Sequence, residues 1–92
     1  MNEIKTIIPK PIASEAIEVT EENIPGITEF LGGEEKRNIL FGINYKNHAV
    51  TISKEDGVVL KAKKGDWIVK DLNGEFWPCA SKLFKKTYDI KE

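Results

Sequence analysis

GDWIVKDLNGEFWPC, residues 65–79, is the stretch that decides the fold. Two runs typical of strands, 67–71 and 75–79, flank the pair Asn73 and Gly74. These two residue types most readily adopt the positive φ angles of a tight turn. The stretch therefore predicts a β-hairpin.

A two-residue turn at Asn73 and Gly74 would fix how the two strands pair. Lys70 then lies opposite Trp77, and paired residues share one face of a hairpin. The face expected to join the core carries Trp67, Val69, Phe76 and Pro78, and the other face carries Ile68, Lys70, Leu72, Trp77 and Cys79.

Length and composition indicate an ordinary globular chain. The 92 residues, 40% hydrophobic and 32% charged, suffice for one domain over 1–92. No run reaches the roughly 20 apolar residues of a membrane helix, and the N-terminus lacks a secretory signal. We therefore expect a cytoplasmic protein with no membrane partner.

The single cysteine and single histidine limit the chemistry. One cysteine forms no internal disulfide, and the pair falls short of a four-ligand zinc site. Gly32 and Gly33 end a predicted helix and do not open one, which excludes a phosphate-binding loop of the NTPase type. We expect no metal and no cofactor.

Charge is nearly balanced, with a formal net charge of −1. Residues 1–46 carry five basic and eight acidic side chains, whereas residues 47–92 carry nine basic and seven acidic ones. Proteins that bind nucleic acid through phosphates are usually far more basic. The balance therefore disfavours nucleic acid as the main partner.

The first third of the chain predicts an arm, a strand and a helix. Two prolines make residues 1–11 an extended N-terminal arm, and a strand follows over 12–19. Apolar residues at helical spacing predict a short amphipathic helix over 24–31, capped by Asn23.

The remainder predicts more strands and a second helix. Alternating runs at 38–47, 48–53 and 57–64 predict three strands, the last with Val58, Leu60 and Ala62 facing inward. Gly65 and Asp66 predict the turn into the hairpin, and residues 81–87 predict a short C-terminal helix. The expected fold is α+β: a bent antiparallel sheet of about five strands, of which a partial barrel is one form, covered by both helices.

The segment GDWIVKDLNGEFWPCASKLFKKTYD, 65–89, resembles the C-terminal signature of small proteins encoded by tailed bacteriophages and prophages. Matching positions include Gly65, Asp66, Trp67, Asn73, Gly74, Phe76 and Cys79. KPIASEAIEV, NIPGITEFLGG and ISKEDGVVLKAKKGDW resemble upstream parts of the same group. NILFGINYKNHAV has no counterpart there, and ASK replaces the usual proline and acidic residue after the cysteine.

The resemblance implies a phage gene whose accessory product acts in the cytoplasm of the bacterial host. The group has no agreed activity, so it assigns no site residue to this chain. The seven matching positions are expected to have structural roles.

Candidate catalytic groups are few. Cys79 and His48 could form a thiol and base pair, but they belong to unrelated predicted turns, and free cysteine is usually buried. Asp66, Asp71 and Glu75 surround the hairpin, where carboxylates usually bond local amides or face water. We therefore expect that the protein is not an enzyme.

Trp77 and nearby lysines are the candidate binding residues. Lys70, opposite Trp77 in the predicted pairing, would lie over the indole. A basic strip beside aromatics could also be formed by Lys61, Lys63, Lys64 and Lys70, together with Lys82, Lys85 and Lys86. The more conservative interpretation is that both tryptophans pack in the core and that the lysines keep the surface soluble.

These observations favour a non-enzymatic phage accessory protein that binds a host or phage macromolecule, with a protein partner favoured, and modulates host machinery or defence. Two alternatives stay open: a nucleic-acid-binding module that uses the lysine strip, and a small-molecule binder that sequesters a nucleotide signal. The oligomeric state also stays open.

Overall fold

The computed structural model describes residues 13–88, with side chains from Glu15 onward, so the predicted arm over 1–11 lies outside the described residues. The strands are β1 (Ala13–Glu18), β2 (Phe41–Asn44), β3 (Ala49–Ser53), β4 (Val59–Ala62), β5 (Trp67–Asp71) and β6 (Phe76–Cys79). The helices are α1 (Ile24–Phe30), a 3-10 turn (Glu34–Lys36) and α2 (Ser81–Thr87). Every strand pair is antiparallel.

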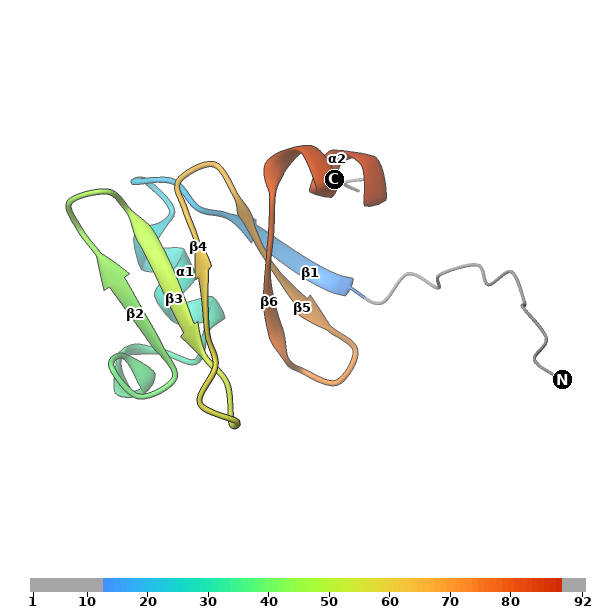
Figure 1. Cartoon of the computed structure of the whole chain (residues 1–92). Helices are drawn as coiled ribbons and strands as arrows, with labels where there is room; N and C mark the ends of the chain where they lie inside the picture. Colours follow the sequence, from blue (N-terminus) through green and yellow to red (C-terminus); the bar gives the residue numbers. More distant parts are fainter. Residues whose placement is uncertain (1–12, 89–92) are drawn as a thin grey trace, which may run out of the picture.

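The six strands of the described part form two sheets, not one (Figure 1). Sheet A has the order β1-β5-β6, and sheet B has the order β2-β3-β4. The predicted α+β class and both predicted helices are confirmed, but the expected five strands and single bent sheet are wrong. The sheets do not close into a barrel, because β4 and β6 lie next to each other as unpaired edges.

Two features keep β6 from pairing with β4. Pro78 has no amide hydrogen, so it cannot donate to a neighbouring strand and belongs on a sheet edge. The main-chain oxygen of Phe76 instead accepts a hydrogen bond from Lys54 Nζ at 3.1 Å. A side chain therefore occupies a position that a ladder bond would take.

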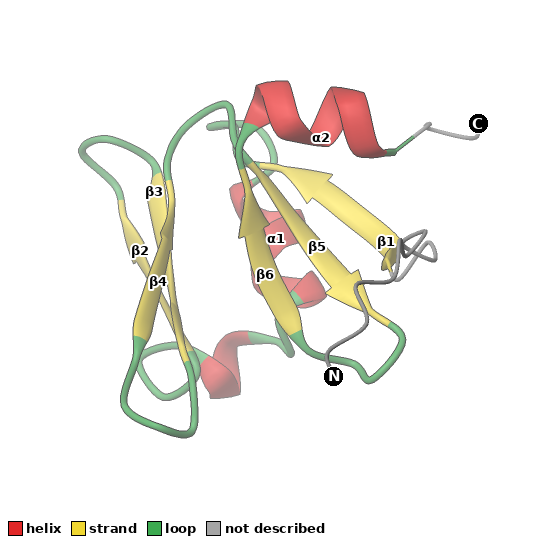
Figure 2. Cartoon of the chain, turned by 45° about the vertical axis from the view of Figure 1, so that its right-hand side comes forward, coloured by secondary structure: helices red, strands yellow, loops and turns green. Residues whose placement is uncertain are grey.

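The main core lies between the two sheets and α1. Ile27, Val50 and Ile68 are fully buried there, one from α1 and one from each sheet. Helix α1 ends at Phe30, and the chain turns away from it at Gly32 and Gly33, whose φ angles of 120° and 93° suit glycine best. Figure 2 shows α1 behind sheet A and α2 across the end of the same sheet.

A second, smaller cluster fixes α2 on sheet A. Phe84 of α2 lies flat on Trp67 of β5, with ring centroids 4.1 Å apart and an interplanar angle of 1°. Val69 and Cys79 complete its buried part. Sheet A is thus covered on one face by the main core and, at one end of the other face, by α2.

The predicted hairpin exists, but its predicted pairing is wrong by one residue. Trp67 pairs with Cys79, Val69 with Trp77, and Lys70 with Phe76. Because side chains alternate along a strand, this shift exchanges the expected faces. The residues expected on one core face separate: Phe76 packs against the main core, whereas Val69 and Trp67 belong to the cluster under α2.

The side chain of Asp71 explains the shift. Its Oδ1 accepts hydrogen bonds from the amides of Asn73 and Glu75 at 2.8 and 3.0 Å. The Asp71 amide in turn donates to the Glu75 carbonyl, which leaves a three-residue loop over 72–74. Gly74, at φ 81°, takes the left-handed position that ends such a loop.

Candidate functional site

Trp77 is a large aromatic on the uncovered end of sheet A. It shares a face with Val69, but β6 is an edge strand and α2 covers the opposite end of that face, so 39% of Trp77 remains exposed. The predicted core role of Trp77 is therefore wrong for this tryptophan, while Trp67 is partly buried against the smaller cluster.

Two contacts hold the exposed indole in place. Its Nε1 donates a hydrogen bond to Asp71 Oδ2 at 2.9 Å. The ammonium group of Lys54 lies 3.8 Å from the ring centroid, a cation–π contact worth roughly 0.5–1 kcal/mol at an exposed site. Because Lys54 Nζ also bonds the Phe76 carbonyl, the same side chain fixes both the ring and the strand edge.

The charge state of Asp71 fits this arrangement. The hydrogen bond from Trp77 lowers the pKa of Asp71 below its ordinary value of 3.8, and the amides of Glu75 and Asn73 and the charge of Lys54 act in the same direction. Asp71 is therefore a carboxylate at neutral pH, able to accept bonds from the loop and from the indole together.

An open hollow of about 310 Å³ lies beside Trp77. Its lining combines apolar and charged groups: Lys54, Glu55, Asp56, Val58, Leu60, Glu75 and Trp77. Three carboxylates and one ammonium give it an acidic rim. Val58, predicted to face inward, is 47% exposed and lines this hollow together with Leu60.

The structure separates the predicted binding residues. Lys70 lies opposite Phe76, not Trp77; its Nζ is 6.0 Å from the Phe76 centroid and 3.8 Å from Glu15 Oε1. The predicted contact between Lys70 and Trp77 is therefore wrong, since the one-residue shift places them on different faces. Lys61 and Lys63 are exposed on sheet B and beyond its end, so they form no strip with Lys70 in the middle of sheet A.

Lys54 is the functional candidate that sequence reasoning missed. It lies in the turn between β3 and β4, 22 residues before Phe76, and reaches Trp77 only because β4 and β6 are neighbours. Local sequence patterns cannot predict a contact between residues this far apart in the chain.

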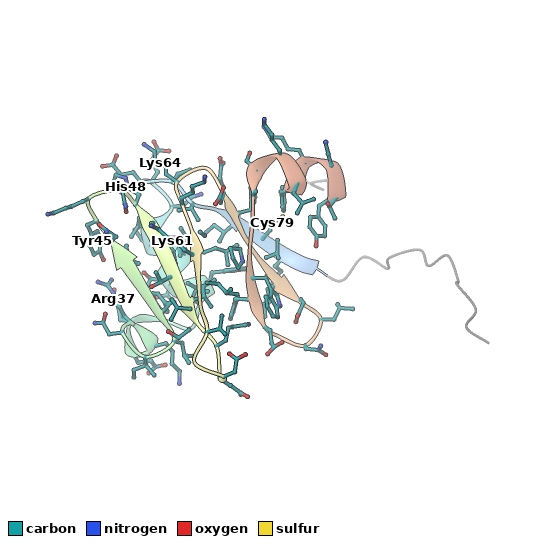
Figure 3. All side chains as sticks on the ribbon, in the orientation of Figure 1. Arg37, Tyr45, His48, Lys61, Lys64 and Cys79 are labelled. Carbon is teal, nitrogen blue, oxygen red and sulfur yellow. The ribbon has the colours of Figure 1, made fainter. Side chains whose placement is uncertain are left out.

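Cys79 and His48 lie apart in the fold. Cys79 is buried on β6, and His48 lies in the turn before β3 on the other sheet (Figure 3). Burial raises the pKa of Cys79, and the negative charge of Asp66 raises it further. The thiol is therefore protonated at neutral pH, which is the unreactive form.

The turn carboxylates and glycines have local structural contacts. Asp66 Oδ2 accepts a hydrogen bond from the Lys63 amide at 3.1 Å, which closes the turn into β5. Gly65 has a φ of 94° in that same turn. Over residues 13–88, no three His, Cys, Asp or Glu side chains gather in a way that could hold a metal ion.

Comparisons with other proteins add no relative. No protein-family model matches the chain, and no curated protein or solved structure is detectably similar to it. Within the described part, neither helix has the length and apolar character needed to cross a membrane.

Proposed function

We propose that the chain is a non-enzymatic phage accessory protein that binds another protein through Trp77 and the hollow beside it. The observation that carries the proposal is the fixed exposed indole, held by Asp71 on its edge and by Lys54 on its face. The resemblance of residues 65–89 to a phage protein group supports the origin and a place of action in the bacterial cytoplasm.

An immobilised aromatic suits protein recognition. Tryptophan is enriched among the residues that contribute most to interfaces, because it buries a large area and loses little conformational entropy. Here Asp71 and Lys54 already restrict the ring before any partner arrives. Val58 and Leu60 extend the apolar surface, so that a partner side chain has an anchor and a place beside it.

The rim of the hollow favours a partner with basic groups. Glu55, Asp56 and Glu75 outnumber Lys54 around the cavity, and complementary charge guides association and orientation. The same carboxylates would repel a phosphate backbone. Protein is therefore favoured over nucleic acid at this site.

The supporting argument against catalysis rests on Cys79 and its surroundings. The one thiol of the chain is buried and has a raised pKa, and His48 lies on the other sheet. Asp66 and Asp71 are engaged in turn hydrogen bonds. These hydrogen bonds stabilise the two turns and account for the positions of both carboxylates.

Affinity capture from the infected bacterial host tests the proposal. Full-length protein and its Trp77→Ala variant are compared with Leu72→Ala, which removes another exposed apolar side chain from the same hairpin. We expect one protein partner to be retained by the parent and by Leu72→Ala and to be lost with Trp77→Ala, while all three unfold at similar temperatures. A partner that is retained equally by Trp77→Ala would contradict the proposal.

A nucleic-acid surface on sheet B is the second candidate. Figure 3 shows Arg37, Tyr45, His48, Lys61 and Lys64 over this sheet, and the guanidinium carbon of Arg37 is 5.6 Å from the Tyr45 centroid. An exposed aromatic among cations is a feature of single-strand binders. Oligonucleotide binding that weakens steeply with salt and is lost with Tyr45→Ala would support it, and its absence at low salt would exclude it.

A further inference from the structure

The hollow beside Trp77 has an apolar wall. It lies between β4, with the turn before that strand, and the start of β6, and the two strands are neighbours (Figure 2). Val58, Leu60 and Trp77 form the apolar part of the lining, and Val58 and Trp77 are exposed. A side chain that fills the hollow therefore has to bring apolar surface as well as charge.

The acidic side chains of the hollow are not balanced within the described part of the chain. No ion pair among residues 13–88 includes Glu55, Asp56 or Glu75. Lys54, the one cation of the lining, donates a hydrogen bond to the Phe76 carbonyl and lies over the indole of Trp77. The hollow is therefore left with an excess of negative charge, which favours a cationic occupant.

The carboxylates are too dispersed to suit a metal ion. Over the described residues, no three acidic, histidine or cysteine side chains converge closely enough to hold one. Asp56 is already engaged, because its Oδ1 accepts a hydrogen bond from the Val58 amide at 3.1 Å. Glu55 and Glu75 come from different loops, one before β4 and the other before β6. A cation that serves both has to spread its charge over several atoms.

An arginine side chain has the shape and the charge that match this lining. Its aliphatic stem lies along apolar surface while its head group stays at the polar rim. The guanidinium group is planar and weakly hydrated and donates up to five hydrogen bonds in a fixed fork, whereas the lysine ammonium is a compact, strongly hydrated point charge. With a volume of about 310 Å³, the hollow has room for a side chain of this length.

Lys54 determines which part of the lining the guanidinium contacts. The Lys54 ammonium lies 3.8 Å from the centroid of the Trp77 ring and is held there by the Phe76 carbonyl. A second cation on the ring beside this ammonium would be repelled by it. The guanidinium therefore belongs at Glu55 and Glu75, and only the aliphatic stem lies along the apolar wall.

We propose that the group of the protein partner that enters the hollow is an arginine side chain. Its stem lies against Val58 and Leu60, and its guanidinium pairs with Glu55 and Glu75. This inference rests on the proposed function, because it assigns the chemistry of the partner that Trp77 contacts. Tryptophan and arginine are both enriched among the residues that dominate interface energies, and such residues tend to pair across an interface.

Titration of the full-length protein with two small probes tests the inference without the partner. The probes are Nα-acetyl-arginine methylamide and Nα-acetyl-lysine methylamide, which carry the same charge, and both are added at constant ionic strength. NMR follows the amides of Glu55, Val58 and Glu75 and the indole N–H of Trp77. We expect the arginine probe to bind with a dissociation constant on the order of 1–10 mM, and the lysine probe to bind at least about threefold more weakly.

Neutral variants locate the guanidinium. Glu55→Gln combined with Glu75→Gln should weaken binding of the arginine probe by about tenfold and remove most of its preference over the lysine probe. The bonds between residue 75 and Asp71 use the main chain of residue 75, so the variant keeps them. Glu29→Gln combined with Glu35→Gln removes two exposed carboxylates outside the hollow and is the matched control, which should bind as the parent does.

Three results would overturn the inference: no binding of the arginine probe at about 50 mM, equal binding of both probes, or binding that is unchanged in the Glu55→Gln and Glu75→Gln variant. None of these results decides whether the protein has a partner. The capture experiment with Trp77→Ala uses neither probe, so it can succeed when the arginine assignment fails. Loss of the proposed function and loss of this inference are therefore distinguishable.

Discussion

Removal of the Phe84 ring should detach α2 from the molecule while both sheets stay folded. Phe84 is only 3% exposed and stacks on Trp67, whereas the helix that carries it has seven residues. Isolated helices need about 12–15 residues to be even marginally stable in water. Helix α2 therefore exists because Phe84 is buried against sheet A, with Tyr88 as a smaller contact.

The magnitude follows from that contact. Burial of a phenylalanine side chain contributes about 1.5–3 kcal/mol, and an aromatic pair adds about 0.5–1.5 kcal/mol. Phe84→Ala should thus reduce the free energy of α2 docking by about 2–4 kcal/mol. A loss of 2 kcal/mol corresponds to an increase of roughly 30-fold in the population of the undocked helix.

Amide hydrogen exchange measured residue by residue is the assay. The amides of residue 84 and Tyr88, which bond Ala80 and residue 84 at 2.8 and 2.9 Å, should exchange at least about 30-fold faster in the variant. The amides of β5 that pair with β1 should keep their protection. Leu83→Ala, at a neighbouring position that is 57% exposed, is the matched control and should change neither set.

Two results would refute this reasoning. If the residue 84 and Tyr88 amides keep their protection in Phe84→Ala, contacts other than the ring hold α2. If β1 and β5 lose protection together with α2, the smaller cluster is not a separable unit, and the helix is part of the cooperative fold.

Three further variants test the hairpin. The pKa of Asp71 is depressed in the folded state, so the Asp71 carboxylate stabilises the folded protein above pH 3.8, and this contribution is lost as the pH falls through the lower folded pKa. Trp77→Phe removes the indole hydrogen bond and should raise the folded pKa of Asp71 toward 3.8, which a carboxyl NMR titration measures. Gly74→Val should destabilise the protein by about 1–2 kcal/mol in urea unfolding, whereas Gly74→Asn, which tolerates positive φ, should cost less. Trp67→Ala should cost about 2–4 kcal/mol, below the cost for a fully buried tryptophan, and Trp67→Phe, which keeps an aromatic ring on Phe84, should cost clearly less; equal losses would show that stacking is unimportant.

Local patterns predicted the elements of this fold well. The spacing of Ile24, Ile27 and Leu31 gave the correct helix, and Asn73 with Gly74 located the hairpin turn. Turn residues and periodicity depend on neighbours in sequence, which is why they can be recognised without a structure. The number of sheets depends instead on which edges meet, and that is decided by tertiary packing.

The register of the hairpin was the main error in the predicted fold, and the predicted binding site was wrong for the same reason. Asp71 bonds two loop amides and so selects a three-residue loop, while the dipeptide rule alone favours a two-residue turn. The error exchanged the faces and placed Lys70 beside Trp77. The cation that is present there, Lys54, comes from a distant turn and could not be inferred from strand pairing.

The central claim is that Trp77 is a contact surface and not a core residue. Fluorescence emission of the Trp67→Phe protein tests it most directly, because Trp77 is then the sole tryptophan of the chain. When the captured protein partner is added, using a partner form that lacks tryptophan, the emission should shift to shorter wavelength as the 39% exposed indole loses water. Binding that leaves the emission of Trp77 unchanged would contradict the claim.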